Sequence, residues 1–282
     1  MKKTYRSIFI SDLHLGSRGC KAETLCDFLK HNTAENLFLV GDIIDGWRLQ
    51  KQWYWPQEHS NVIREILTAS KKGSNVVYVV GNHDEEFRRW LHFMPQIGNL
   101  KVVNRYDYTG IDGVNRLVIH GDMFDTLMHL KTGRWLMKLG DTLYDFIIKL
   151  NDMWAIVRSK LGMSYWSMSK WIKDNTKHAV KYVLNFEELM SDYCNSKGYA
   201  GIICGHIHKP EIKMVGDISY MNTGDFVENC SALVEHHDGR WEIIIWSKGK
   251  NDVGIDTSSG KHKQSKRHSG KSDTGISDTT SV

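Results

Sequence analysis

The chain has 282 residues, of which 41% are hydrophobic and 11% aromatic, so it can bury a core and lacks the composition of a disordered protein. The apolar run near its start is only about four residues long, whereas a signal peptide needs about 7 to 15 and a membrane span about 18. We therefore expect neither export nor membrane insertion; the formal net charge is +4, and we expect no nucleic-acid partner.

The cysteines are odd in number, scattered along the chain and without a Cys-x-x-Cys pair. This pattern favours neither a disulfide framework nor a thiolate metal site. We expect a protein of the reducing cytoplasm. The five cysteines are Cys20, Cys26, Cys194, Cys204 and Cys230.

In the first hundred residues, apolar runs typical of strands alternate with helical periodicity. This alternation predicts strand, helix, strand units and hence a mostly parallel sheet. The expected strands are 8–10, 36–41 and 75–81, and the expected helices are 22–30, 58–70 and 85–94.

From residue 101 the pattern changes to short strands joined by glycine-rich turns. We predict an α/β fold in which two mixed β-sheets pack face to face, with helices on the outside. The later strands are 101–103, 106–109 and 116–120, followed by 199–204, 212–215, 218–221, 230–236 and 241–246.

A stretch without strand signals, about residues 124–196, interrupts this second set of strands. Apolar residues recur in it every three or four positions, which predicts helices inserted into a domain of residues 1–248. They can simply pack on the core. Between positions 128 and 182, however, ten Lys or Arg stand against four Asp, and basic, Trp-bearing helices can also rest on an anionic membrane or hold an acyl chain. Residues 249–282 have few large apolar side chains, and we predict a disordered tail.

The candidate functional residues stand at the ends of predicted strands. Each block places polar side chains on the loop that leaves a buried strand, where α/β sheets bind ligands. The glycines beside them let the backbone turn tightly. One such block arises easily by chance, whereas five in order on one chain do not. The blocks are Asp12-x-His14, Gly41-Asp42-x-x-Asp45, Gly81-Asn82-His83-Asp84, His120-Gly121-Asp122 and Gly205-His206-x-His208.

Together these blocks resemble the signature of the calcineurin-like metallophosphoesterases, over about residues 6–246. The resemblance implies the four-layer sandwich of that family, with the helical insertion over a site for two divalent metal ions. It also implies the ligands, position by position. The first ion is bound by Asp12, His14, Asp42 and His208, and the second by Asp42, which bridges both ions, together with Asn82, His120 and His206.

Imidazole, carboxylate and amide ligands form a donor set of intermediate hardness, which favours Mn, Fe, Co or Zn over Mg. By the family resemblance we expect manganese. Two such ions can activate a water molecule and hold a phosphoryl group in line with it. His83 is not a ligand in this pattern, so we predict that it acts on the phosphate as a general acid or charge stabiliser. We predict that Asp45 fixes its tautomer through a hydrogen bond.

Within that family, Gly46-Trp47, the run from His120 to Asp125 and the insertion most resemble the UDP-2,3-diacylglucosamine pyrophosphatases of lipid A synthesis. This implies a hydrolase that cleaves the diphosphate of a nucleotide-linked lipid, in peripheral contact with the anionic inner face of the membrane. The chain departs from that group at two positions. The main branch of the group has Arg where this chain has His83, and the group has Glu near the position of Asp45. Two alternatives stay open: a soluble phosphoesterase for a nucleotide or phosphodiester, and a metal-binding scaffold without turnover.

The remaining histidines lie in helical or polar contexts or next to a turn. We expect those in helical or polar contexts to face solvent, and we assign none of them a role. Among them are His31, His59, His92, His129 and His178, with His236 and His237 before the Asp238-Gly239 turn.

Overall fold

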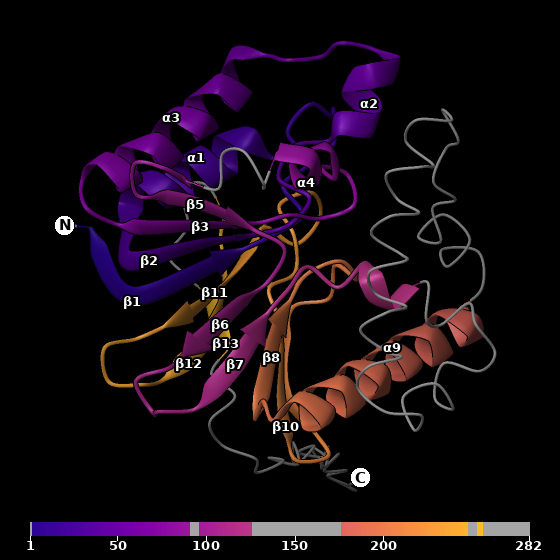
Figure 1. Ribbon diagram of the computed structural model, residues 1–282. Coiled ribbons are helices and arrows are strands. Elements are labelled where there is room, and N and C mark those ends of the chain that lie inside the picture. The colour runs from indigo at the N-terminus through magenta and orange to yellow at the C-terminus, as the bar shows by residue number, and fades with distance from the viewer. Residues whose placement is uncertain (1, 91–95, 126–175, 248–252, 256–282) are drawn as a thin grey trace, which may run out of the picture.

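The computed structural model describes residues 2–90, 96–125, 176–247 and 253–255, and in them two β-sheets pack face to face between outer helices (Figure 1). The first sheet is mixed. Its strands β1, β2, β3 and β5 run parallel, and its other neighbours pair antiparallel. In spatial order the strands are β13 (Val253–Ile255), β12 (Trp241–Ile245), β11 (Ser231–Glu235), β1 (Lys3–Ile10), β2 (Asn32–Val40), β3 (Asn75–Val79), β5 (Leu100–Val103) and β4 (Gln96–Ile97).

The second sheet is also mixed, as predicted. Its three central strands run parallel, and the strand at each edge pairs antiparallel with its neighbour. In spatial order they are β6 (Tyr106–Thr109), β7 (Asn115–Val118), β8 (Gly201–Cys204), β10 (Ile218–Asn222) and β9 (Glu211–Val215).

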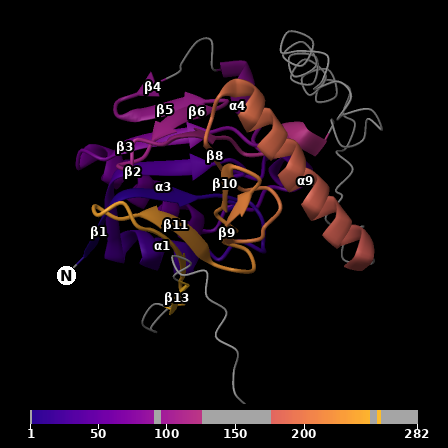
Figure 2. The ribbon, with the colours of Figure 1, turned by 90° about the horizontal axis from the view of Figure 1, so that it is seen from below.

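Helices cover the outer face of each sheet and complete four layers. α1 (Ala22–His31) and α3 (Gln57–Lys71) pack on the first sheet, and α9 (Thr176–Lys197) lies along the second (Figures 1 and 2). Two short helices, α2 (Gly46–Lys51) and α4 (Glu86–Trp90), follow β2 and β3. Within the described ranges, no helix combines the length and apolar character that a membrane span requires.

Alternate residues of the central strands are buried in different layers. In β1, Ile8 and Ile10 pack beneath α1 and α3, whereas Phe9 faces the second sheet. In β8, Ile202 packs against α9 and Ile203 faces the first sheet. Because both faces of these strands are buried, they read in the sequence as continuous apolar runs.

Three elements were not predicted from the sequence: α2, β4 and β13. β13 lies within the predicted tail, where residues 253–255 pair antiparallel with β12. The backbone groups along the edge of a sheet readily accept a short strand, even one in a polar segment. The rest of the predicted tail, and residues 126–175 of the predicted insertion, lie outside the described residues. The last part of the insertion forms α9.

Candidate metal centre

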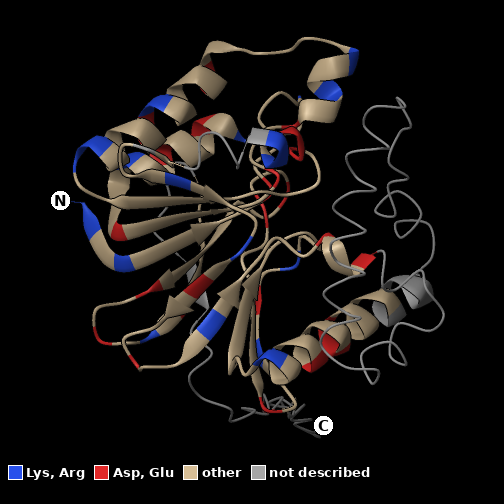
Figure 3. Cartoon of the chain, viewed as in Figure 1, with Lys and Arg blue, Asp and Glu red and all other residues tan. Residues whose placement is uncertain are grey.

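The loops that follow β1, β2, β3, β7 and β8 meet at one edge of the sandwich, and acidic residues lie on the first four of these loops (Figure 3). Neighbouring loops continue the pairing of their strands. In the first sheet, the backbone N–H of Asp12 donates to the carbonyl of Gly41 at 3.0 Å. In the second, the N–H of Gly205 donates to the carbonyl of His120 at 3.1 Å. Parallel strands end at the same edge, so the five predicted blocks come together there.

Five of the predicted ligands have a left-handed backbone, which is uncommon for residues other than glycine. The φ angles of Asp12, His14, Asp42, His206 and His208 lie between 50° and 70°. Among the described residues, only one other non-glycine residue has a positive φ. Such conformations cost about 1–3 kcal/mol each and cluster at functional sites.

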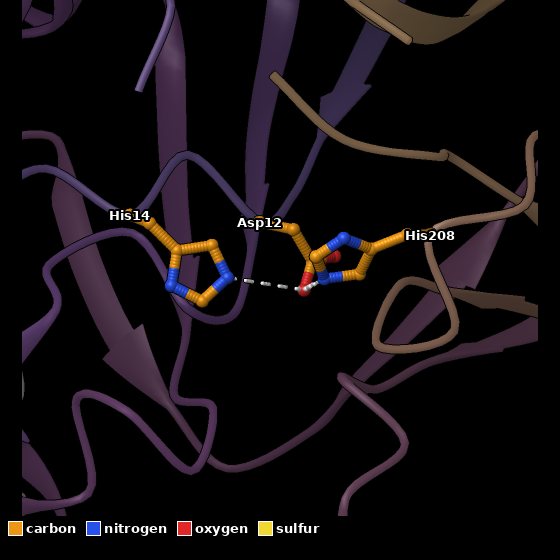
Figure 4. Close-up of side chains that lie close together, drawn as sticks. All are labelled: Asp12, His14 and His208. Carbon is orange, nitrogen blue, oxygen red and sulfur yellow. Dashed lines mark ion pairs between the residues drawn. The ribbon is translucent and has the colours of Figure 1, made fainter. Parts of the chain in front are cut away.

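Asp12 lies between two of its predicted co-ligands (Figure 4). Its Oδ1 is 3.1 Å from Nε2 of His208 and 4.0 Å from Nε2 of His14, and its Oδ2 accepts the backbone N–H of His206 at 3.0 Å. Burial disfavours the charged carboxylate, but the nearby histidines outweigh burial and lower the pKa of Asp12. In the same way, burial opposes protonation of His208, yet the carboxylate of Asp12 raises its pKa to about 9.

Asp42 is the second centre of the site. Its carboxylate lies 3.4 Å from Nε2 of His120, 3.8 Å from that of His83 and 3.9 Å from that of His14. Asp42 and Asp12 belong together to one group of possible ligand atoms, and the bridging role of Asp42 stays a prediction. The three groups, each within 4.8 Å, are Asp12 with His14 and His208, His14 with Asp42 and His83, and Asp12 with Asp42 and His120.

Three buried ligand atoms make no hydrogen bond with the described residues: Oδ1 of Asp12, Oδ1 of Asn82 and Nε2 of His120. Nδ1 of His120 lies 3.0 Å from the carbonyl of Val40, which can only accept a proton. In the neutral ring the lone pair is therefore on Nε2. Buried polar atoms without a hydrogen bond are rare, and although two of these atoms form ion pairs, Oδ1 of Asp12 with His208 and Nε2 of His120 with Asp42, a divalent ion would satisfy all three. Their imidazole, carboxylate and amide chemistry fits an ion such as Mn²⁺.

His206 enters the site from the second sheet, with its ring edge-on to that of His120 at a centroid distance of 5.0 Å. Its Nε2 lies 2.9 Å from Oδ2 of Asp125, which leaves Nδ1 for an ion. His206 belongs to none of the three groups of ligand atoms described above. Its role as a ligand therefore rests on the family resemblance and stays a prediction.

The hydrogen bond predicted between Asp45 and His83 is present, with 3.0 Å between Oδ1 and Nδ1. Asp45 is also the N-cap of α2, where it accepts the N–H of Arg48 at 3.1 Å. The indole of Trp47 packs against the His83 ring at a centroid distance of 4.1 Å. Burial opposes protonation of His83, but the carboxylates of Asp42 and Asp45 raise its pKa. His83 is thus held from two sides, with Nε2 toward Asp42.

The glycines of the blocks serve the site chiefly by leaving room. A Cβ at Gly81 would lie 2.3 Å from Oδ1 of Asp42, and one at Gly205 would lie 2.5 Å from Oδ2 of Asp12. Neither glycine has a positive φ, so what the structure shows at these two positions is the need for space. At Gly41 the prediction holds, because its φ is 80°.

Asp84 belongs to the third block but received no role from the sequence. It is buried, and its Oδ2 accepts the N–H of Ile43 at 2.8 Å and the O–H of Tyr78 at 2.6 Å. Its Oδ1 accepts the N–H of Gly81 at 2.6 Å. Asp84 therefore ties the loop that carries Asp42 to the loop that carries the third block. The place of Asp84 in the third block could have marked it in the sequence as a residue with a role. Its contacts with Ile43 and Tyr78 could not be predicted, because these residues are not adjacent to it in the sequence.

The expectation that His59 faces solvent is wrong. The residue is buried in α3, and its Nδ1 accepts the backbone N–H of Gly16 at 3.0 Å. Burial lowers its pKa. Tyr54 and Trp55 pack edge-on against its ring. His59 thus supports the loop that follows His14.

Residues 5–210 match the calcineurin-like phosphoesterase family. The match covers most of the chain and contains all seven predicted ligands. The chain belongs to the calcineurin-like phosphoesterase family. This family implies divalent metal ions, and the groups of ligand atoms around Asp12 and Asp42 are the candidates for binding them.

Relatives of this calcineurin-like phosphoesterase include proteins named UDP-2,3-diacylglucosamine hydrolase. The one from Neisseria gonorrhoeae is 33% identical over 124 residues, which are 43% of this chain and 50% of that protein. The one from Neisseria meningitidis serogroup A is 32% identical over 130 residues, 45% of this chain and 51% of that protein. The chain thus spans about half the length of these relatives. A DNA polymerase II small subunit from Methanothermobacter thermautotrophicus is 25% identical over 155 residues, 42% of this chain and 31% of that protein.

Solved structures of other phosphoesterases align with this one at low scores. A phosphoesterase from E. coli has a TM-score of 0.42 and 12% identity, over 89% of this chain and 98% of that chain. An archaeal phosphodiesterase has a TM-score of 0.41 and 12% identity, over 85% of this chain and 98% of that chain. These scores are too low to carry an argument about the site.

Proposed function

We propose that the protein is a metal-dependent hydrolase that cleaves a phosphate ester or a diphosphate. The observation that carries this proposal is the convergence of buried or half-buried residues with left-handed backbone around Asp12 and Asp42, with ligand atoms that lack hydrogen bonds among the described residues. We propose manganese as the metal. The first ion would be bound by Asp12, His14, Asp42 and His208, and the second by Asp42, Asn82, His120 and His206.

Bound divalent ions would supply a water molecule of lowered pKa and positive charge against the phosphoryl oxygens. The contribution of the chain itself centres on His83. Asp45 accepts the Nδ1 proton of His83 and so leaves Nε2 directed to the site. When it is protonated, Nε2 can give its proton to the leaving oxygen or stabilise charge on the phosphate. A positioned acid of this kind contributes about 10²- to 10⁴-fold.

An assay with and without Mn²⁺ tests this activity. The purified protein is given a chromogenic phosphodiester and, separately, a nucleotide diphosphate sugar. We expect product release that depends on the metal. A protein that binds the metal but releases product from neither compound would instead be a metal-binding scaffold without turnover.

For the substrate we propose UDP-2,3-diacylglucosamine or a related nucleotide-linked lipid. The names of the Neisseria relatives support this class. The insertion of residues 124–196 supports it too, since its basic and tryptophan residues suit a phosphorylated lipid at a membrane surface. The flanks of the insertion lie at the site, because Tyr182 donates to Asp125, which contacts His206. On this proposal the protein works in the cytoplasm, in peripheral contact with the inner face of the membrane.

A soluble nucleotide or phosphodiester is the alternative substrate, since the chain has His83 where the main branch of the lipid hydrolases that it resembles has Arg. Kinetics on UDP-2,3-diacylglucosamine and on UDP-N-acetylglucosamine, with and without anionic vesicles, separate the two. Acyl chains held by the protein should raise kcat/KM by orders of magnitude, at about 0.8 kcal/mol per buried methylene. Equal kcat/KM for both compounds, without co-sedimentation on vesicles, would favour the soluble substrate.

A further inference from the structure

Behind the half-buried His206, two buried side chains continue a chain of hydrogen bonds that the sequence did not predict. The O–H of Tyr182 donates to Oδ1 of Asp125 at 2.6 Å, and Oδ2 of Asp125 lies 2.9 Å from Nε2 of His206. Asp125 and Tyr182 are both buried, and the side chain of His206 is 11% exposed. We call these three residues the Tyr182 relay.

The relay fixes which atom of His206 is free. Since a carboxylate only accepts protons, Nε2 of His206 carries a proton toward Asp125 and the other ring nitrogen, Nδ1, remains for an ion. The ring is confined on its remaining sides as well. It stacks on Phe186 of α9 at a centroid distance of 6.0 Å and lies edge-on to His120 at 5.0 Å.

We infer that Asp125 and Tyr182 are positioning residues for the second metal ion, acting through His206. A carboxylate bonded to the far nitrogen of a histidine ligand fixes its orientation and raises its basicity, and here the tyrosine in turn fixes the carboxylate. This inference rests on the proposed function and deepens it, because it assigns α9, which carries Tyr182, a part in binding the ion.

The place of the relay in the chain gives it a second consequence. Asp125 is the last described residue before positions 126–175, and Tyr182 stands in the first helix after them. A single carboxylate therefore joins both flanks of that stretch to a predicted metal ligand. The buried pair of Tyr108 and Glu235 does not have this connection, because Tyr108 donates to Glu235 within the core between the sheets.

Titration of the metal-free chain with Mn²⁺, followed by the EPR signal of the free ion, tests the inference without any substrate. Asp125→Asn keeps the shape of the side chain but removes its charge, and we expect the affinity for the second ion to fall about 10- to 100-fold. Tyr182→Phe should lower the affinity for the second ion by a smaller factor. The first ion, bound without His206, should keep its affinity in both variants. The matched control is Tyr108→Phe, which removes the O–H that donates to another buried carboxylate, that of Glu235. This variant should keep the affinities for both ions within about twofold of the wild-type values.

Three results would overturn the inference. The first is a second ion bound by Asp125→Asn and Tyr182→Phe as tightly as by the wild-type chain. The second is an equal loss of affinity for both ions in Asp125→Asn or Tyr182→Phe, or the same loss of affinity in Tyr108→Phe. Either result shows general destabilisation of the protein instead of positioning of His206. If Asp125→Asn does not fold, Tyr182→Phe decides alone. The third is a wild-type chain that binds a single ion, which would also overturn the proposed site, whereas the first two leave the proposed function intact.

Discussion

Two carboxylates of the sandwich, Asp12 and Glu235, are equally inaccessible to solvent but differ in their partners. Glu235 lies in β11 opposite Ser7 of β1, and its two oxygens accept hydrogen bonds from the O–H of Tyr108 and the N–H of Ile111. Asp12 follows the carboxyl end of β1. Its Oδ1 makes no hydrogen bond with the described residues, although two histidine rings surround it.

This difference distinguishes a carboxylate of the protein core from a carboxylate of the candidate metal site. A buried carboxylate that accepts hydrogen bonds from core groups on both oxygens holds elements together, whereas one that has an oxygen facing only imidazoles is suited to bind an ion. The backbone shows the same contrast, because Glu235 is part of a regular strand and Asp12 has a φ of 52°. Neither burial nor charge alone distinguishes the two residues.

The largest effect should come from removing the proposed bridging ligand. In Asp42→Ala, His14, His83 and His120 lose their shared negative partner, and both proposed ions lose a ligand. We expect loss of the second ion and a fall in kcat/KM of about 10³-fold or more, because several kcal/mol of charge stabilisation disappear. Elemental analysis after gel filtration measures the metal. Wild-type metal content in this variant would contradict the bridging role.

The next effect should be that of His83→Ala. We expect unchanged metal content and a fall in turnover of about 10²- to 10⁴-fold, because His83 is proposed to act on the phosphate. Metal content is the deciding measurement, since one group of possible ligand atoms contains His83. A loss of metal as complete as in Asp42→Ala would make His83 a ligand.

Asp45→Asn should cost less, about 10- to 100-fold in kcat/KM, by releasing the ring of His83. Asp45 also lies 3.5 Å from Nδ1 of His14, so its effect has a second route through the first ion. Kinetics of the double variant separate the routes. Added to His83→Ala, Asp45→Asn should cause no further loss, and a further loss of similar size would place its effect at His14.

The smallest functional effect should come from a change next to the core carboxylate Glu235. Tyr108→Phe removes a donor from Glu235, and a buried acceptor left unsatisfied lowers the free energy of unfolding by about 1–3 kcal/mol. Denaturant unfolding measures this loss, and kcat/KM and metal content should stay at wild-type values. A drop in metal content would show that the two buried carboxylates are not independent.

The sequence by itself determined the order of the elements and the positions of the ligand blocks. Apolar periodicity and the change to polar residues at a strand end depend on neighbouring residues, so both can be read locally. β1 ends at Ile10 and β2 at Val40, in each case two residues before a predicted ligand. The hydrogen bond between Asp45 and His83 was also predicted, because both residues belong to recognisable blocks.

Only the tertiary structure decided which side chains support those blocks. Asp125 contacts His206, 81 positions away, because the strands before them, β7 and β8, pair in the second sheet. It contacts Tyr182 because α9 packs against that sheet. His59 reaches Gly16 across 43 positions for a similar reason, namely the packing of α3 on the first sheet. Local periodicity shows that a residue lies on a helix or strand, but its partner is set by how distant elements pack.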